Sequence, residues 1–173
     1  MTRRMDTKYE QSHIAINDRY AGKVQVSLGI TSEGIASIYT FHENMNSEMY
    51  RDILCDHHLP GARRIFGIRQ QYFFAHDNDR KHTSQLVRGF LAAVQVRVLP
   101  WPAKSPDLNP VENVWSIITQ KVHDESPTDV MELEASIHRA AQSIDVNVFR
   151  RLVASIPNRL QSVIDAEGWQ TKY

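Results

Sequence analysis

A strand–helix–strand pattern in the middle of the chain most restricts what this sequence can fold into. The short aromatic run at residues 71–76 predicts a buried strand that ends at Asp77. Thr83 or Ser84 can cap a following helix, and the apolar run at residues 96–99 predicts a second strand. Because a helical crossover returns the chain in the same direction, we expect the two strands to be parallel. The pattern therefore predicts part of an α/β sheet.

A second pattern, closer to the start of the chain, predicts an antiparallel hairpin. Apolar residues alternate with others over residues 24–30, which indicates a strand with one buried face. A Ser-Glu-Gly turn follows, and residues 35–41 predict the returning strand. Asn46 or Ser47 can then cap a short helix, which we expect to end at the Leu-Pro-Gly run of residues 59–61.

Helical spacing of apolar residues dominates the rest of the chain. The segments with this spacing are 111–122, 130–137, 149–153 and 157–164. Residues 1–22 are polar and mixed in charge, so we expect an irregular N-terminal segment in which only residues 14–16 look strand-like. The fold class is therefore predicted to be α/β, a mixed sheet flanked by helices with a helical C-terminal tail, in one domain over residues 23–173.

The balanced charge of the chain gives no general sign of a nucleic-acid binder. Its 20 basic and 20 acidic residues leave a formal net charge of zero, so any contact with DNA must come from local basic pairs. Such pairs are by default solvated surface. The candidates are Arg63 with Arg64, Arg80 with Lys81, and Arg150 with Arg151.

The cysteine and hydropathy patterns point to an intracellular chain. The single cysteine, Cys55, excludes a disulfide framework and a cysteine-based zinc site within one chain, and it fits a reducing compartment. The start has no apolar signal-peptide core, and no run approaches the length that spans a membrane. We therefore expect no membrane partner.

Two carboxylates stand at the ends of predicted elements, and each has two interpretations. Asp77 ends a predicted sheet strand, where the ligands of open α/β sheets gather, but it can also close the strand as an Asx turn. Asn109 can cap the next long helix with Pro110 in its first position, so Glu112 can be a capping-box acid. Glu112 also lies beside the apolar stripe and can point to the end of the sheet. Phosphodiester cleavage by two Mg²⁺ ions needs hard oxygen ligands from different elements, which these two carboxylates supply in part.

Around both carboxylates the sequence resembles a known family. Residues 98–115, which read VLPWPAKSPDLNPVENVW, resemble the signature around the last catalytic carboxylate of the mariner-type transposase superfamily. The HDN of residues 76–78, followed by the HTS of residues 82–84, resembles the segment around that family's second catalytic Asp. Thirty-four residues separate Asp77 from Glu112, an interval typical of one major branch of the superfamily. The resemblance covers nearly all of the chain after its first 22 residues.

The resemblance implies a ribonuclease-H-like fold and a role in DNA transposition and DNA integration. Members of this family cut transposon ends and join them to target DNA with two divalent ions, Mg²⁺ or Mn²⁺, held by an Asp-Asp-Glu triad. By this resemblance Asp77 would be the second metal ligand and Glu112 the third, and both would be catalytic. The implied partners are DNA, both transposon ends and target, and a second copy of the chain in a homodimer. The implied location is the nucleus.

The family's first Asp has no counterpart in the matched part of the chain. The strand that carries it lies upstream of the segment matched at Val24, so the resemblance predicts a partial DDE-type domain that lacks the first central strand. Asp18 is the best substitute among the preceding acids, but it lies closer to the next strand than the family pattern allows. Asp107 is interpreted as a turn former. His82 can lie near the site, but a surface or packing histidine is the favoured interpretation.

Three functions are compatible with these features. The first is a DNA-cleaving and strand-joining enzyme. The second is a catalytically inactive transposase remnant that binds nucleic acid or protein at most. The third is an unrelated metal-dependent hydrolase that uses Asp77 and Glu112, which the SPDLNPVE block of residues 105–112 argues against. The sequence leaves the choice between the first two open, because nothing in residues 1–22 clearly replaces the first Asp.

Overall fold

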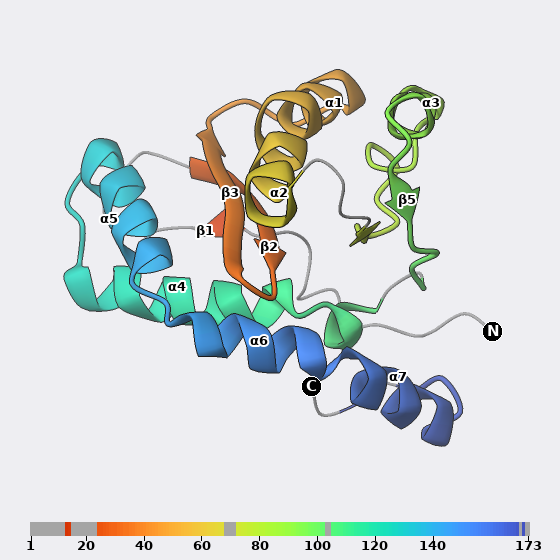
Figure 1. Cartoon of the computed structure of the whole chain (residues 1–173). Helices are drawn as coiled ribbons and strands as arrows, with labels where there is room; N and C mark the ends of the chain where they lie inside the picture. Colours follow the sequence, from red (N-terminus) through yellow and green to blue (C-terminus); the bar gives the residue numbers. More distant parts are fainter. Residues whose placement is uncertain (1–12, 15–23, 68–71, 103–104, 170, 172–173) are drawn as a thin grey trace. The chain divides into compact units, whose positions relative to one another are not determined.

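The chain forms two compact units in the computed structural model, which describes residues 13–14, 24–67, 72–102, 105–169 and 171. The first unit comprises residues 1–42 and 106–173, and the second comprises residues 43–105. Figure 1 shows the elements of both units in their sequence colours. Within the described residues, no helix combines the length and the apolar character that a bilayer crossing requires.

The described strands of the first unit form an antiparallel sheet. β1 (His13–Ile14), β2 (Val24–Thr31) and β3 (Gly34–Phe41) lie side by side in that order. Gly34 has a φ of 123°, a conformation that suits glycine, and it opens β3 directly after the turn. The hairpin predicted from the alternating pattern is therefore confirmed, with an irregular register between Gly29 and Ile30.

Three amphipathic helices pack on this sheet and build the core of the first unit. They are α4 (Val111–Glu125), α5 (Val130–Gln142) and α6 (Val146–Ala154). Their apolar residues recur at helical spacing, so each helix turns one stripe toward β2 and β3. The buried residues of this core are Val24, Val26, Val114, Trp115, Ile118, Val122, Leu133, Ile137, Ala140, Ala141 and Phe149. The helical spacing predicted for α4 and α5 is thus confirmed.

A short 3₁₀ turn and a last helix complete the first unit. The turn, η2 (Pro106–Leu108), leads into α4, and α7 (Ile156–Asp165) follows α6. Pro157 lies in the first turn of α7, where a missing N–H costs nothing, as predicted. Contacts between α7 and η2 bring the C-terminal part of the chain to the start of α4.

The second unit begins with a helical segment that runs further than predicted. Asn46 caps α1 (Ser47–Ile53), its Oδ1 accepting the N–H of Met49 at 2.8 Å. The chain then widens into a π-helical turn, η1 (Leu54–His58), and continues as α2 (Leu59–Phe66). The predicted end at residues 59–61 is wrong, because the proline falls in the first turn of α2, where no N–H donor is needed.

The strand–helix–strand pattern of the second unit is confirmed, although its strands are short. β4 (Phe73–Phe74) and β5 (Arg97–Val98) are parallel, and α3 (Gln85–Ala93) joins them. Ser84 caps α3, as predicted, by accepting the N–H of Val87 at 3.3 Å. The prediction of a buried aromatic strand is wrong in part, because the side chain of Phe73 is 65% exposed. The buried residues of this unit's cluster are Tyr50, Leu54, Val87 and Leu91.

Candidate functional site

Asp77 lies in the loop that follows β4, at the carboxyl end of a strand with a parallel neighbour. Its side chain is 53% exposed. Oδ1 accepts a hydrogen bond from the backbone N–H of Asp79 at 3.1 Å and another from Nδ1 of His82 at 2.5 Å. The Asx turn predicted for Asp77 is therefore present. Both of these bonds use the same oxygen, so Oδ2 stays available to a cation.

Local hydrogen bonds fix the loop that carries Asp77. Asp79 accepts the N–H of Lys81 at 3.0 Å through Oδ1 and pairs with its ammonium at 2.6 Å through Oδ2. The carbonyl oxygen of Asp79 accepts the backbone N–H groups of His82 and Thr83, both at 3.0 Å. Asp79 thus holds the loop through both its side chain and its carbonyl oxygen.

His82 belongs to a cluster of rings beside Asp77. Its ring centroid lies 3.9 Å from that of Tyr50 and 5.8 Å from that of His76. The Tyr50 hydroxyl and Nδ1 of His76 form a hydrogen bond of 3.1 Å. The packing role predicted for His82 is present, and its ring in addition forms a hydrogen bond with the candidate ligand Asp77. Its position five residues after Asp77, across a tight turn, was the available signal.

The electrostatics of this cluster keep the carboxylate ionised and two of its neighbours neutral. Burial raises the pKa of Asp77, but the hydrogen bond and charge of His82 and the N–H of Asp79 outweigh it and hold the pKa below its ordinary value. Burial, aided by the charge of His82, lowers the pKa of His76 to about 4. Burial and then the charges of Asp77 and Asp79 raise the pKa of Tyr50. At neutral pH the Tyr50 hydroxyl and the His76 ring are therefore uncharged.

Asn78 ties together the two loops that follow the parallel strands. Its side-chain Nδ2 donates to the carbonyl oxygen of Trp101 at 2.5 Å. Trp101 follows β5, and Asp77 follows β4, so the bond joins the carboxyl ends of both strands. In open α/β sheets, ligands gather at this edge, which places Asp77 where a site is expected.

Glu112, the second predicted ligand, lies in the first turn of α4 and is exposed. The helix begins one residue later than predicted, with Pro110 at the capping position, so Glu112 is the second helical residue and not the third. Asn109 lies one residue before the capping position and still accepts a hydrogen bond from the helix, because its Oδ1 accepts the N–H of Val111 at 3.2 Å. The carbonyl of Asn109 also accepts the N–H of Glu112 at 3.2 Å.

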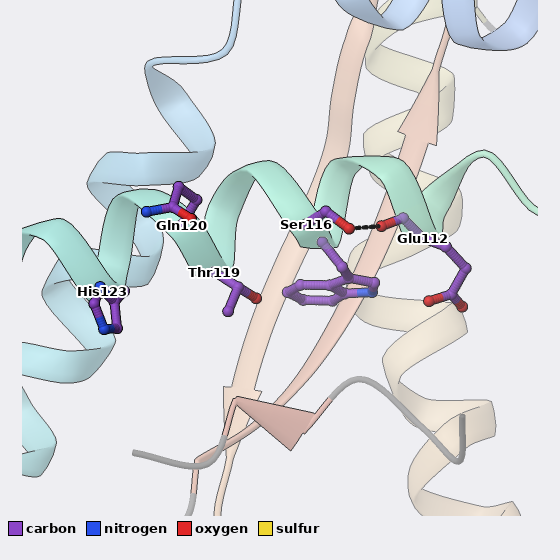
Figure 2. A pocket seen from close by; sticks show the side chains of 6 residues that line it. Glu112, Ser116, Thr119, Gln120 and His123 are labelled. Atoms are coloured by element: carbon purple, nitrogen blue, oxygen red, sulfur yellow. Dashed lines mark hydrogen bonds between the residues drawn. The ribbon is translucent and has the colours of Figure 1, made fainter. Parts of the chain in front are cut away.

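Glu112 stands at one end of a polar face of α4. Figure 2 shows its side chain on the same side of the helix as Thr119 and His123, and its carbonyl accepting the Ser116 hydroxyl at 3.0 Å. These residues line a pocket of about 340 Å³ together with Trp115 and Gln120. The carboxylate of Glu112 therefore borders an open space, as a ligand of a substrate-bound ion must.

A buried polar network supports the start of α4. The carboxylate of Asp107, which is 3% exposed, accepts the N–H and the hydroxyl of Thr171 at 3.0 and 3.1 Å. Arg159, also 3% exposed, donates to the carbonyl of Asp107 at 3.0 Å and to Oδ1 of Asn113 at 2.7 Å. Asp107 is thus engaged inside the fold, in agreement with a role in the turn. No local pattern in the sequence indicates the contact between Asp107 and Thr171.

The two carboxylates suit a divalent metal ion in donor chemistry. Mg²⁺ and Mn²⁺ prefer carboxylate and water oxygens, and both Asp77 and Glu112 present such oxygens at accessible positions. Asp77 belongs to the second unit and Glu112 to the first. Among the residues that the structure describes, no group of three or more His, Cys, Asp or Glu gathers as a metal site. Asp18 lies outside the described residues. The fit therefore concerns ligand type, and the two residues supply only part of a coordination shell.

Comparison with known proteins gives related sequences and related structures. A family model described as "DDE superfamily endonuclease" matches residues 4–134. The transposable element Tcb1 transposase of Caenorhabditis briggsae is 36% identical over 129 residues, which cover 75% of this chain and 46% of that protein. The transposable element Tc1 transposase of Caenorhabditis elegans is 32% identical over 152 residues, which cover 88% of this chain and 55% of that protein. The chain thus spans about half the length of these curated relatives.

Solved structures show a similar fold. The catalytic domain of Mos1 mariner transposase matches with a TM-score of 0.78 at 19% sequence identity, covering 91% of this chain and 80% of that one. The Mos1 mariner paired end complex with Mn matches with a TM-score of 0.74 at 19% identity, covering 100% of this chain and 51% of that one. At this identity the likeness establishes the fold alone.

Proposed function

We propose, because the chain belongs to the DDE superfamily endonuclease family, that it provides the nuclease function of a transposase. The activity is metal-dependent cleavage of DNA phosphodiester bonds and strand transfer, in DNA transposition and DNA integration. The family match across residues 4–134 carries the proposal, because that range includes both Asp77 and Glu112. It favours an active nuclease over an inactive remnant. The Mos1 catalytic-domain likeness supports a ribonuclease-H-like fold. The predicted single mixed sheet stays a prediction, because the described strands form an antiparallel sheet and a separate parallel pair.

Asp77 and Glu112 are the residues that would hold the metal ions, two Mg²⁺ or Mn²⁺ as the resemblance implies. The Mos1 catalytic domain has been crystallised with Mn and with Mg, which supports this choice of ion. When bound, such an ion lowers the pKa of a water molecule and stabilises the leaving oxygen of a phosphodiester. Asp77 contributes an oxygen from a loop fixed by Asp79, and Glu112 contributes one from the first turn of a helix. The expected lack of a first central strand, and Asp18 as a weak substitute for its Asp, stay predictions.

DNA is the proposed partner, and the surface charges indicate where phosphates could bind. Of the predicted basic pairs, Lys81 is paired with Asp79 and Arg150 with Glu33. Arg63, Arg80 and Arg151 have no acidic partner among the described residues, and all three are exposed. These three arginines are therefore the better phosphate ligands. The Mos1 complexes with transposon ends support DNA as partner and a homodimer on paired ends. A nuclear location follows from this substrate as a proposal.

A plasmid-nicking assay with the purified chain tests the proposal. We expect Mn²⁺ or Mg²⁺ at low salt to support nicking of supercoiled plasmid, and Asp77→Asn and Glu112→Gln each to reduce it to the metal-free background. Asp124→Asn is the matched control, because Asp124 is an exposed carboxylate at the other end of α4. Circular dichroism checks that every variant is folded. Absence of metal-dependent nicking by the folded chain, or full nicking by Asp77→Asn, would refute the proposal.

A further inference from the structure

We infer that His82 is a positioning residue for Asp77: its Nδ1–H holds Oδ1 of the carboxylate and leaves Oδ2 to a divalent cation. The inference rests on the proposed function, because it requires Asp77 to bind a metal ion. It adds a residue that acts through the ligand and takes no part in the coordination itself. The geometry of the described residues around Asp77 supports this role.

The direction of the hydrogen bond follows from the chemistry of its two atoms. An ionised carboxylate only accepts, so Nδ1 of His82 must carry the hydrogen in the 2.5 Å contact with Oδ1 of Asp77. Nδ1 carries a hydrogen in the Nδ1–H tautomer and in the protonated ring alike, so the direction of this bond does not depend on the charge of His82. The ring therefore offers Asp77 a directed donor.

The surroundings of His82 hold that donor in place. The ring is 15% exposed and lies against Tyr50, with 3.9 Å between centroids, and nearly parallel to His76, with an interplanar angle of 10°. The backbone N–H of His82 is bonded to the carbonyl of Asp79 at 3.0 Å. Because the backbone and the side chain of His82 are both already restrained, the hydrogen bond to Asp77 costs little further conformational entropy.

Two donors converge on the same oxygen of Asp77. The N–H of Asp79 reaches Oδ1 at 3.1 Å from the backbone, and His82 reaches it at 2.5 Å from the side. Together they fix the plane of the carboxylate and distinguish its oxygens, one for the protein and one for a ligand. Hydrogen bonds to ligating carboxylates orient them in metal sites, and their loss typically weakens metal binding about ten- to a hundredfold.

A pair of amide substitutions separates a donor role from a structural one. The amide nitrogen of Asn can stand near the position of Nδ1, whereas that of Gln reaches toward the position of Nε2. We expect His82→Asn to keep the Mn²⁺ affinity of the 173-residue chain within about threefold, and His82→Gln to weaken it about ten- to a hundredfold. Water-proton relaxation during a Mn²⁺ titration measures the affinity. His138→Asn, a histidine on α5, is the matched control, and thermal melting reports whether each variant folds.

The comparison with Asp77→Asn keeps this inference distinct from the proposed function. If Asp77→Asn binds Mn²⁺ as tightly as the unmodified chain, Asp77 is no ligand and the proposed site fails. If Asp77→Asn weakens binding but His82→Asn and His82→Gln behave alike, the positioning role is overturned and the site stands. A metal-free ¹H–¹⁵N spectrum of the imidazoles gives a second reading. We expect a hydrogen on Nδ1 of His82 in the unmodified chain, and an Nδ1 that carries no hydrogen overturns the inference.

Discussion

Replacing Arg159 by Met should lower the free energy of unfolding of the first unit by about 3 kcal/mol. The guanidinium is buried and donates to Oγ of Ser155 at 2.8 Å, to the carbonyl of Asp107 at 3.0 Å and to Oδ1 of Asn113 at 2.7 Å. Met is unbranched and apolar and has a comparable reach, so the substitution removes the hydrogen bonds while it keeps much of the packing.

The magnitude follows from the acceptors that the change leaves behind. The Ser155 hydroxyl keeps its own bond to the carbonyl of Leu152 at 2.6 Å, so its loss is small. The Asp107 carbonyl and the Asn113 amide oxygen each lose a charged donor. An unsatisfied buried acceptor such as the Asp107 carbonyl costs about 1–3 kcal/mol, and the half-buried Asn113 adds a smaller cost, because water can reach it. Removing the desolvation penalty of a buried guanidinium offsets part of this sum. A net loss of about 3 kcal/mol is the result.

Urea denaturation followed by circular dichroism measures the difference. Arg151→Met is the matched control, because Arg151 is exposed on α6 and has no acidic partner among the described residues. We expect the control to change stability by less than about 0.5 kcal/mol. A loss below about 1 kcal/mol for Arg159→Met, or equal losses for both variants, would show that this network does not hold α7 to the start of α4.

Two further predictions concern the buried groups of each unit. Burial lowers the pKa of His58 from 6.5 to about 4. Between about pH 6.5 and pH 4 the unfolded chain therefore binds a proton that the folded chain does not, so the stability is full above about pH 6.5 and falls as the pH falls toward 4. His58→Gln should therefore flatten the fall in stability between pH 7 and pH 5 in urea titrations, and an unchanged slope would contradict the assignment. Ile118→Ala should lower the free energy of unfolding by about 2–5 kcal/mol, because Ile118 is fully buried between α4 and the sheet. Ile164→Ala, at an exposed site, should lower it far less, and thermal melts of both variants measure the difference.

Local periodicity explains which parts of the fold could be predicted. The alternation of apolar residues in β2 and the apolar stripe of α4 each depend on residues within one element, so both can be recognised from the sequence without knowledge of the tertiary structure. Pro60 was misleading, because a proline ends a helix only where the helix needs the backbone N–H that proline lacks. In the structure, the N–H of Leu59 bonds to the carbonyl of Leu54, five residues back, and the widened turn admits the proline into the next helix.

The sequence predicts the two candidate ligands but not the residues that support them. Asp77 and Glu112 are predicted because their flanking sequences carry a family signature, and their role as ligands stays a proposal. Tyr50 was missed because it lies on α1, and only the tertiary fold brings it against His82. The contact between Asp107 and Thr171 spans 64 residues and has no local pattern at all. Contacts of this range are specified by packing, which a single sequence does not display.

Asp77 also shows that two interpretations of one residue need not compete. From the sequence, the Asx turn and the metal ligand were alternatives for a single carboxylate. The structure assigns the turn to Oδ1, through the N–H of Asp79, and adds His82 to the same oxygen. The turn thereby orients the carboxylate and keeps its pKa low, so that Oδ2 is charged and open at neutral pH. The turn is therefore a condition for the proposed ligand role of Asp77. Asp77→Asn keeps an oxygen that can accept the turn hydrogen bond but removes the charge, whereas His82→Gln disturbs only the orientation.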